Sequence, residues 1–206
     1  MAATKLFQFT DNLLDRQIEE LVRNSWGSNG VYWKDDILPL ANVTPVGPSL
    51  TPVLSTDGEG WLFHDAQDEG AVIVVQISHG WEIGASIKPH IHWQKTTDAA
   101  GDVEWELYYD MAENGGDFSG AYTPLATAWG PIADTVDNGT ANRLLITPLG
   151  EIDMSAVTTP SAMIKFRISR IAGSGANDTY GGDVKALSFD YHYRVNAPGG
   201  RDEYTK

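Results

Sequence analysis

The sequence predicts an all-β protein: a jelly-roll-like antiparallel β-sandwich with an N-terminal helix and an extended arm. Several segments alternate between apolar and polar residues, which is the pattern of half-buried strands. Seven Trp, eight Tyr and six Phe supply side chains that favour pleated surfaces. The 21 Gly and 10 Pro residues are typical of many turns. We place the helix and arm in residues 1–60 and the sandwich in residues 61–206.

The alternating segments set the strands of the predicted sandwich. The clearest patterns lie at 71–77, 85–95, 103–111, 162–171 and 184–195, with weaker ones near 121–128 and 143–147. Seven or eight strands of this kind indicate a β-sandwich or jelly roll. The apolar side of these strands predicts an aromatic core centre, formed by Trp93, Trp105, Phe166, Phe189 and Tyr191.

Residues 10–26 carry the convincing helical pattern of the chain. Thr10 or Asp11 can cap it, and an apolar stripe recurs at helical spacing: Leu14, Ile18, Leu21, Val22 and Trp26. A helix this short is marginal alone, so the stripe must dock on its own domain or on a neighbouring subunit. We take the stripe as the candidate partner-binding surface. The proline-rich stretch at 27–60 predicts an extended arm, because proline lacks the amide donor that a central strand needs.

Charge and cysteine content exclude several classes of function. The formal net charge of −14 disfavours nucleic acid and anionic membranes as partners. The absence of cysteine excludes disulfides, thiolate nucleophiles and Cys-type zinc sites. No signal-peptide pattern opens the sequence and no run of 18 apolar residues occurs, so we expect synthesis in a cytoplasm and no membrane span.

The segment "KPHIHW" at 88–93 raises the question of a metal site. Gly84 and the pair His90 and His92 resemble the opening of the first cupin motif, whose two histidines bind a metal inside a jelly-roll barrel. His192 and Asn196 resemble the end of the second cupin motif. The sequence departs from the cupin pattern where a glutamate ligand would follow His92, because threonines stand there, and where a Pro-x-Gly would precede His192.

Strand alternation turns these histidines away from the predicted core. His90 and His92 lie opposite Ile91 and Trp93, and His192 likewise opposes aromatic neighbours. The candidate metal ligands are His90, His92, His192 and Glu104. We nevertheless expect a polar sheet face with no metal and no cofactor. Because no hydrolase, phosphate-loop or metalloprotease motif occurs either, we expect a protein that is not an enzyme.

A second resemblance covers more of the chain. Residues 87–116, with their P-H-x-H-W and G-x-V-x-W strands, and the C-terminal residues 177–206 resemble segments of virion proteins of tailed bacteriophages and prophages, as does "GEID" at 150–153. The resemblance implies a component of the phage particle.

We take a capsid cement or decoration protein as the leading hypothesis: a homotrimer on the capsid exterior that binds the major capsid protein. One alternative is a tail, fibre or receptor-binding protein that contacts a host glycan, with Trp26, Trp33, Trp81 and Trp129 as candidates to stack on sugars. A second alternative is a cupin-like metal-binding protein.

Overall fold

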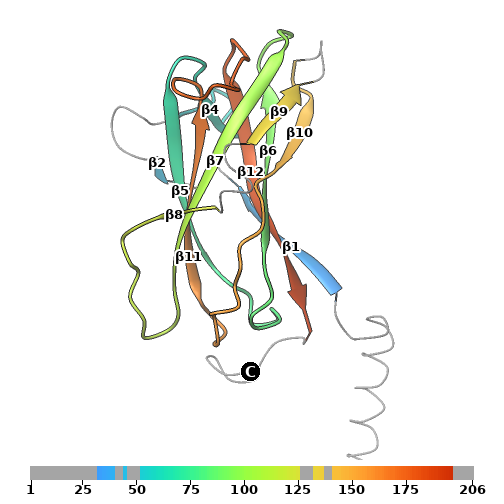
Figure 1. The fold of residues 1–206 in the computed structure, drawn as a ribbon. Helices are drawn as coiled ribbons and strands as arrows, with labels where there is room; N and C mark the ends of the chain where they lie inside the picture. Colours follow the sequence, from blue (N-terminus) through green and yellow to red (C-terminus); the bar gives the residue numbers. More distant parts are fainter. Residues whose placement is uncertain (1–31, 40–43, 46–51, 126–131, 137–140, 197–206) are drawn as a thin grey trace, which may run out of the picture.

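The computed structural model describes residues 32–39, 44–45, 52–125, 132–136 and 141–196, and these form two six-stranded antiparallel sheets packed face to face (Figure 1). The strands of the first, sheet A, are β1 (Tyr32–Pro39), β3 (Val53–Leu54), β4 (Trp61–Phe63), β6 (Lys88–Lys95), β10 (Leu144–Pro148) and β12 (Val184–Val195). The strands of the second, sheet B, are β2 (Thr44–Pro45), β5 (Asp68–Gln76), β7 (Gly101–Ala112), β8 (Thr123–Pro124), β9 (Ile132–Val136) and β11 (Met163–Ile171).

The order of the strands is that of a jelly roll. The longer strands of sheet A lie in the order β1–β12–β6–β10, and those of sheet B in the order β5–β11–β7–β9. From β5 through β7, and again from β9 through β12, the chain crosses to the opposite sheet at each long strand (Figure 1). This is the double-sheet arrangement that jelly rolls use. The predicted fold class is therefore confirmed. Within the described residues, no helix is long and apolar enough to cross a membrane.

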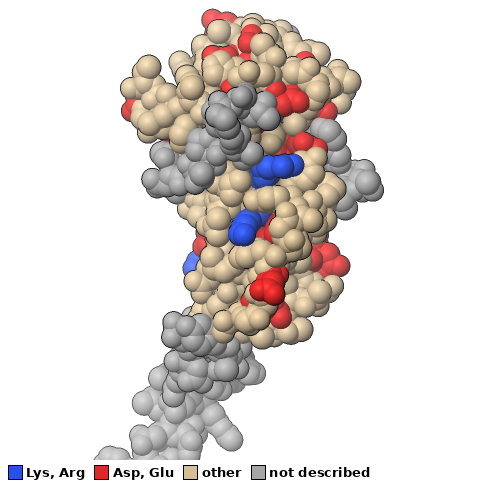
Figure 2. Space-filling model, turned by 90° about the vertical axis from the view of Figure 1, so that its left-hand side faces the viewer, with Lys and Arg blue, Asp and Glu red and all other residues tan. Residues whose placement is uncertain are grey.

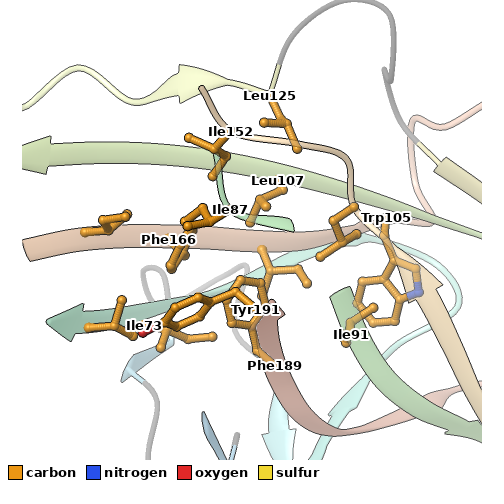
Figure 3. Close-up of a cluster of buried hydrophobic side chains, with 14 of the residues drawn as sticks. Ile73, Ile87, Ile91, Trp105, Leu107, Leu125, Ile152, Phe166, Phe189 and Tyr191 are labelled. Carbon is orange, nitrogen blue, oxygen red and sulfur yellow. The ribbon is translucent and has the colours of Figure 1, made fainter. Parts of the chain in front are cut away.

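The core lies between the two sheets, and its centre is the one expected. Trp93, Trp105, Phe166, Phe189 and Tyr191 are all buried, and side chains from both sheets point toward one another in Figure 3. The rings of Phe166 and Phe189 meet across the sheets with centroids 4.8 Å apart, and those of Trp93 and Trp105 with centroids 6.1 Å apart. Aromatic pairs at such distances add stability beyond the area that they bury.

A bulge in β12 extends the core beyond what alternation predicts. The pairing of β12 with β6 shifts register between Ala186 and Ser188. Strict alternation from Phe189 would turn Val184 and Ala186 outward, but both are fully buried. The extra residue reverses the parity of the strand, as bulges do, and brings both ends of β12 onto the core.

The first strand corrects the expected domain boundary at residue 60. Residues 32–39, assigned above to an arm, pair with β12 over eight residues, and β2 and β3 pair with sandwich strands. Asp36 accepts hydrogen bonds from the hydroxyls of Tyr191 and Tyr193, each at 3.1 Å. The proline argument failed because β1 and β2 are strands at sheet edges, where a missing amide donor is tolerated. The predicted helix at 10–26 and its apolar stripe lie outside the described residues.

Candidate functional site on the outer face of sheet A

The outer face of sheet A carries the histidines that the sequence singles out. His90 and His92 point to this face from β6, and the register places Asp190 of β12 directly opposite His90. Two residues further along β12, on the same face, His192 lies opposite Asp35 of β1. We call these five residues the His–Asp cluster. Their outward direction agrees with the alternation, and it rules out the interior metal site of cupins for these histidines, because Ile91 and Trp93 fill the core side of β6.

Asp190 is the centre of the His–Asp cluster. Its Oδ2 lies 3.6 Å from Nε2 of His90 and 3.4 Å from Nε2 of His92. The His90 ring lies between the other two, with centroids 5.0 Å from His92 and 4.7 Å from His192. His192 has a separate partner, since its Nε2 lies 3.0 Å from Oδ2 of Asp35.

Three buried polar atoms of this cluster have no hydrogen-bond partner among the residues that the structure describes: Nε2 of His92 and both carboxylate oxygens of Asp190. The Asp190 side chain is 1% exposed and that of His92 is 24% exposed. Separations of 3.4 and 3.6 Å exceed the range of about 2.7–3.2 Å for N–H···O bonds. Buried carboxylates normally accept several hydrogen bonds, so this site calls for a ligand or a partner.

Electrostatics couples the histidines to the carboxylate. The Asp190 carboxylate raises the pKa of His90, although burial by itself would lower it. Burial by itself would raise the pKa of Asp190, but the neighbouring His90, the Ser188 side chain and the charge of His92 hold it below its ordinary value. His90 and Asp190 therefore favour a negative carboxylate beside a positive imidazole.

Exposed apolar side chains flank the cluster on both edge strands. Trp33 and Ile37 of β1 are 51% and 64% exposed, and Leu144 and Ile146 of β10 are 55% and 52% exposed. The register places Ile37 beside Asp190 and Ile146 beside His92, so apolar and polar groups share one continuous face. Edge strands with such side chains are ready-made surfaces for pairing with another chain.

A hollow of about 470 Å³ opens beside the cluster, lined by Trp33, Lys34, Asp35, Lys88 and His192. The ammonium group of Lys88 lies 5.0 Å from the centre of the Trp33 ring. Of the four tryptophans proposed to stack on sugars, Trp33 is thus exposed at a hollow, whereas Trp81 is buried in the core. Trp26 and Trp129 lie outside the described residues.

Glu104 does not join the histidines, which corrects its place among the metal candidates. It is buried on β7, in sheet B, and its carboxylate accepts hydrogen bonds from the backbone amide and the side chain of Asn177 at 2.9 and 3.3 Å. Glu104 therefore fixes the loop between β11 and β12. Beside it, the fully buried Arg170 forms a two-pronged ion pair with Asp178, with both N–O distances at 2.9 Å. The loop is a structural one, tied down by two buried charged side chains.

Two important residues, Arg170 and Asp190, were not singled out from the sequence. Arg170 falls in phase with the inward residues Ile164, Phe166 and Ile168, and a charged residue in an apolar phase indicates a buried, paired cation. Asp190 stands two residues before His192 on the polar side of β12. Its place beside His90 depends on which strands are neighbours and in which register, and alternation within one strand carries no information on either.

Comparisons with known proteins find similarity in structure only. No protein-family model matches the chain, and no curated protein sequence matches it. A structure of infectious bursal disease virus, Gx strain, covers 84% of this chain at 15% identity and a TM-score of 0.39. An insecticidal delta-endotoxin of Bacillus thuringiensis covers 79% at 13% identity and a TM-score of 0.46. A xylan-binding module covers 78% at 14% identity and a TM-score of 0.41.

The chain spans 33% of the virus chain, 24% of the endotoxin chain and 97% of the xylan-binding module. Structures similar to this chain thus include a virus protein and a carbohydrate-binding module. At these identities and TM-scores we carry no function over from them.

Proposed function

We propose that the protein is a non-enzymatic virion component of a tailed bacteriophage, a decoration protein that binds the major capsid protein on the capsid exterior as a homotrimer. The outer face of sheet A is its docking surface. A second contact with the shell is made by the apolar stripe of the N-terminal segment, which consists of Leu14, Ile18, Leu21, Val22 and Trp26.

One coincidence carries this proposal. The two segments whose sequences resemble phage virion proteins, 87–116 and 177–206, supply the neighbouring strands β6 and β12 at the centre of sheet A, and 87–116 also supplies β7 of sheet B. The strands at the edges of the same sheet carry six of the seven exposed large apolar side chains among the described residues: Trp33, Ile37, Val53, Leu54, Leu144 and Ile146. The part of the sequence resemblance that lies in β6 and β12 therefore shares sheet A with an unusual apolar exposure.

The physical mechanism is stabilisation by mass action. Each large apolar side chain that becomes fully covered contributes about 1.5–3 kcal/mol. In a trimer, three such surfaces act together, and the effective concentration of the second and third raises the overall affinity without new contacts. A protein that binds the assembled shell and not its dissociated subunits raises the resistance of the shell to heat.

The proposal is tested by adding purified protein to heads of the encoding phage or prophage that lack this chain, and measuring the protein that sediments with them. Ile146→Ser removes an apolar group from the docking surface, and we expect the affinity to fall about tenfold to a hundredfold. Val74→Ser is the matched control, because Val74 is 53% exposed on sheet B. We expect it to bind as the parent does. An equal loss for both variants, or no binding of the parent to heads, contradicts the proposal.

Glycan binding is the second candidate function, and Trp33 favours it. An exposed indole at a hollow with Lys88 and Asp35 offers a stacking surface next to hydrogen-bonding groups. A receptor-binding protein at the tail would use it to hold a host sugar. Binding to immobilised glycans that is lost in Trp33→Ala, together with an absence of the chain from heads, would replace the decoration role with this one.

A further inference from the structure

We propose that His90, His92 and Asp190 bind one divalent transition-metal ion of the zinc type on the outer face of sheet A. The sequence favoured a polar face without a metal, and the cupin arrangement is ruled out. The proposed site is a different one, on the outside of the sandwich and with a carboxylate ligand from β12. It stands independently of the virion role.

The separations between the side chains fit a shared ion better than a hydrogen bond. Zinc lies about 2.0–2.2 Å from imidazole nitrogen and carboxylate oxygen, so two ligands at a tetrahedral angle lie about 3.3–3.6 Å apart. Oδ2 of Asp190 is 3.4 Å from Nε2 of His92 and 3.6 Å from Nε2 of His90. Ligand atoms of all three residues lie within 4.8 Å of one another.

The unpaired atoms point to the same conclusion. Asp190 is fully buried, and neither of its carboxylate oxygens has a hydrogen-bond partner among the described residues. Nε2 of His92, which is aimed at the same carboxylate, is also buried without one. A buried carboxylate without hydrogen-bond partners costs folding free energy, even beside imidazoles at 3.4 and 3.6 Å, and such uncompensated groups are uncommon unless they bind something. An ion bound between these atoms would satisfy the carboxylate and the imidazole together.

The ligand set selects the class of metal. Two imidazoles and one carboxylate suit zinc and its neighbours in the first transition row, whereas calcium and magnesium prefer oxygen ligands alone. His192 is already paired with Asp35 at 3.0 Å, so we assign three protein ligands. The fourth position is reached from the side of His92, which is the most exposed of the three.

The test is a calorimetric titration of the untagged full chain with Zn²⁺ at neutral pH, with Mg²⁺ titrated in parallel. We expect one Zn²⁺ per chain and no Mg²⁺ binding. His92→Gln and Asp190→Asn should each lower the Zn²⁺ affinity at least about a hundredfold, which exceeds the usual loss on removing an outer partner of a metal ligand. His64→Gln is the matched control, since His64 pairs with Glu69 away from the cluster. It should leave the affinity unchanged.

Melting in excess chelator shows that each variant is folded before its titration is interpreted, and His92→Gln is the safer variant because that side chain is partly exposed. Replacing Zn²⁺ by Co²⁺ adds a spectroscopic readout, because its visible absorption reports tetrahedral coordination. The proposal is overturned if the parent binds no Zn²⁺. It is equally overturned if His92→Gln and Asp190→Asn, both folded, bind as tightly as the parent, or if His64→Gln abolishes binding.

Discussion

The outer faces of the two sheets both carry buried carboxylates, but the two carboxylates differ in their hydrogen bonding. On sheet B, the buried carboxylate of Asp110 accepts hydrogen bonds from the amide and hydroxyl of Ser119 and from the amide of Gly120, at 2.9–3.1 Å. Lys165 lies 3.6 Å from the centre of the Phe118 ring, and Arg167 lies 4.3 Å from that of Tyr108. On sheet A, Asp190 is just as buried and accepts no hydrogen bond from the described residues.

This difference indicates that the outer face of sheet B, unlike that of sheet A, satisfies its buried polar groups without a partner. Among the side chains described on the outer face of sheet B, none has a buried polar atom that lacks a hydrogen bond. Figure 2 shows one face of the molecule, largely uncharged, with basic side chains near its middle and acidic ones toward its ends. Sheet A combines unpaired buried atoms with apolar groups open to solvent. Both features disfavour the isolated chain and favour a bound ion or a partner, so we assign function to sheet A.

The largest expected effect on stability is the difference between deleting residues 1–30 and deleting β1 as well. Deleting 1–30 should leave the melting temperature of the free protein nearly unchanged, whereas deleting 1–39 should abolish cooperative folding. The longer deletion removes the eight-residue pairing with β12 and the acceptor of two buried tyrosine hydroxyls. Melting followed by circular dichroism gives the comparison. Equal melting of the two truncated proteins would show that β1 is dispensable to sheet A.

The next largest effect on stability is expected from a substitution in the core between the two sheets. Trp105→Ala should lower the free energy of unfolding by about 3–5 kcal/mol, the range for truncating a buried aromatic side chain. Trp105 is fully buried and packs edge-on against Phe63 at 5.2 Å between centroids. Denaturant titration measures the change. A variant as stable as the parent would mean that the inner and outer faces are exchanged and that the histidines point into the sandwich.

A matched pair of substitutions compares the two buried carboxylates directly. Asp110→Asn should cost about 1–3 kcal/mol, because the amide is a poorer acceptor for three donors and places its own N–H groups against them. Asp190→Asn should cost less in the metal-free protein, because Asp190 accepts no hydrogen bond from the described residues. Chemical unfolding of both variants in chelator gives the two values. The comparison fails if Asp190→Asn is the more destabilising change.

The smallest effect is the pH dependence of sheet B. Burial would raise the pKa of Asp110, but the Ser119 hydroxyl and the amides of Gly120 and Ser119 outweigh it and hold the pKa below its ordinary value of 3.8. A lowered folded-state pKa contributes stability that is present above the unfolded-state pKa and is lost as pH falls through the folded-state value. The stability difference between the parent and Asp110→Asn should therefore be constant above about pH 5 and shrink below pH 3.8. If the stability difference grew on acidification, the pKa of Asp110 in the folded protein would be raised and not lowered.

The fold was predictable because alternation reports which side of a strand is apolar. Trp93, Trp105 and Phe166 reached the core as expected, since burial of one face decides the direction of every side chain on the strand. The bulge at Leu187 was missed because the alternation was read from Phe189 through Leu187 alone; the adjacent apolar residues Ala186 and Leu187, where the alternation changes phase, are the mark that it leaves in the sequence. β1 was missed because its exposed edge position removes the apolar alternation that marks central strands.

The candidate site was only half predictable. His90 and His92 stand out in the sequence, and their outward direction follows from Ile91 and Trp93 beside them. The partner that matters, Asp190, comes from a strand about a hundred residues later, and only the pairing of β12 with β6 brings it to His90. Glu104 was wrongly grouped with the histidines for the same reason, since its strand belongs to the opposite sheet.

The most direct measurement of whether sheet A is the docking surface is an electron-microscopy map of the phage particle in which the proposed function places this chain. We expect density for the jelly roll at regular positions on the head, with β1 and β10 and the His–Asp cluster between them against the shell and the outer face of sheet B toward solvent. Density with sheet B against the shell and the cluster open to solvent would contradict the assignment of function to sheet A.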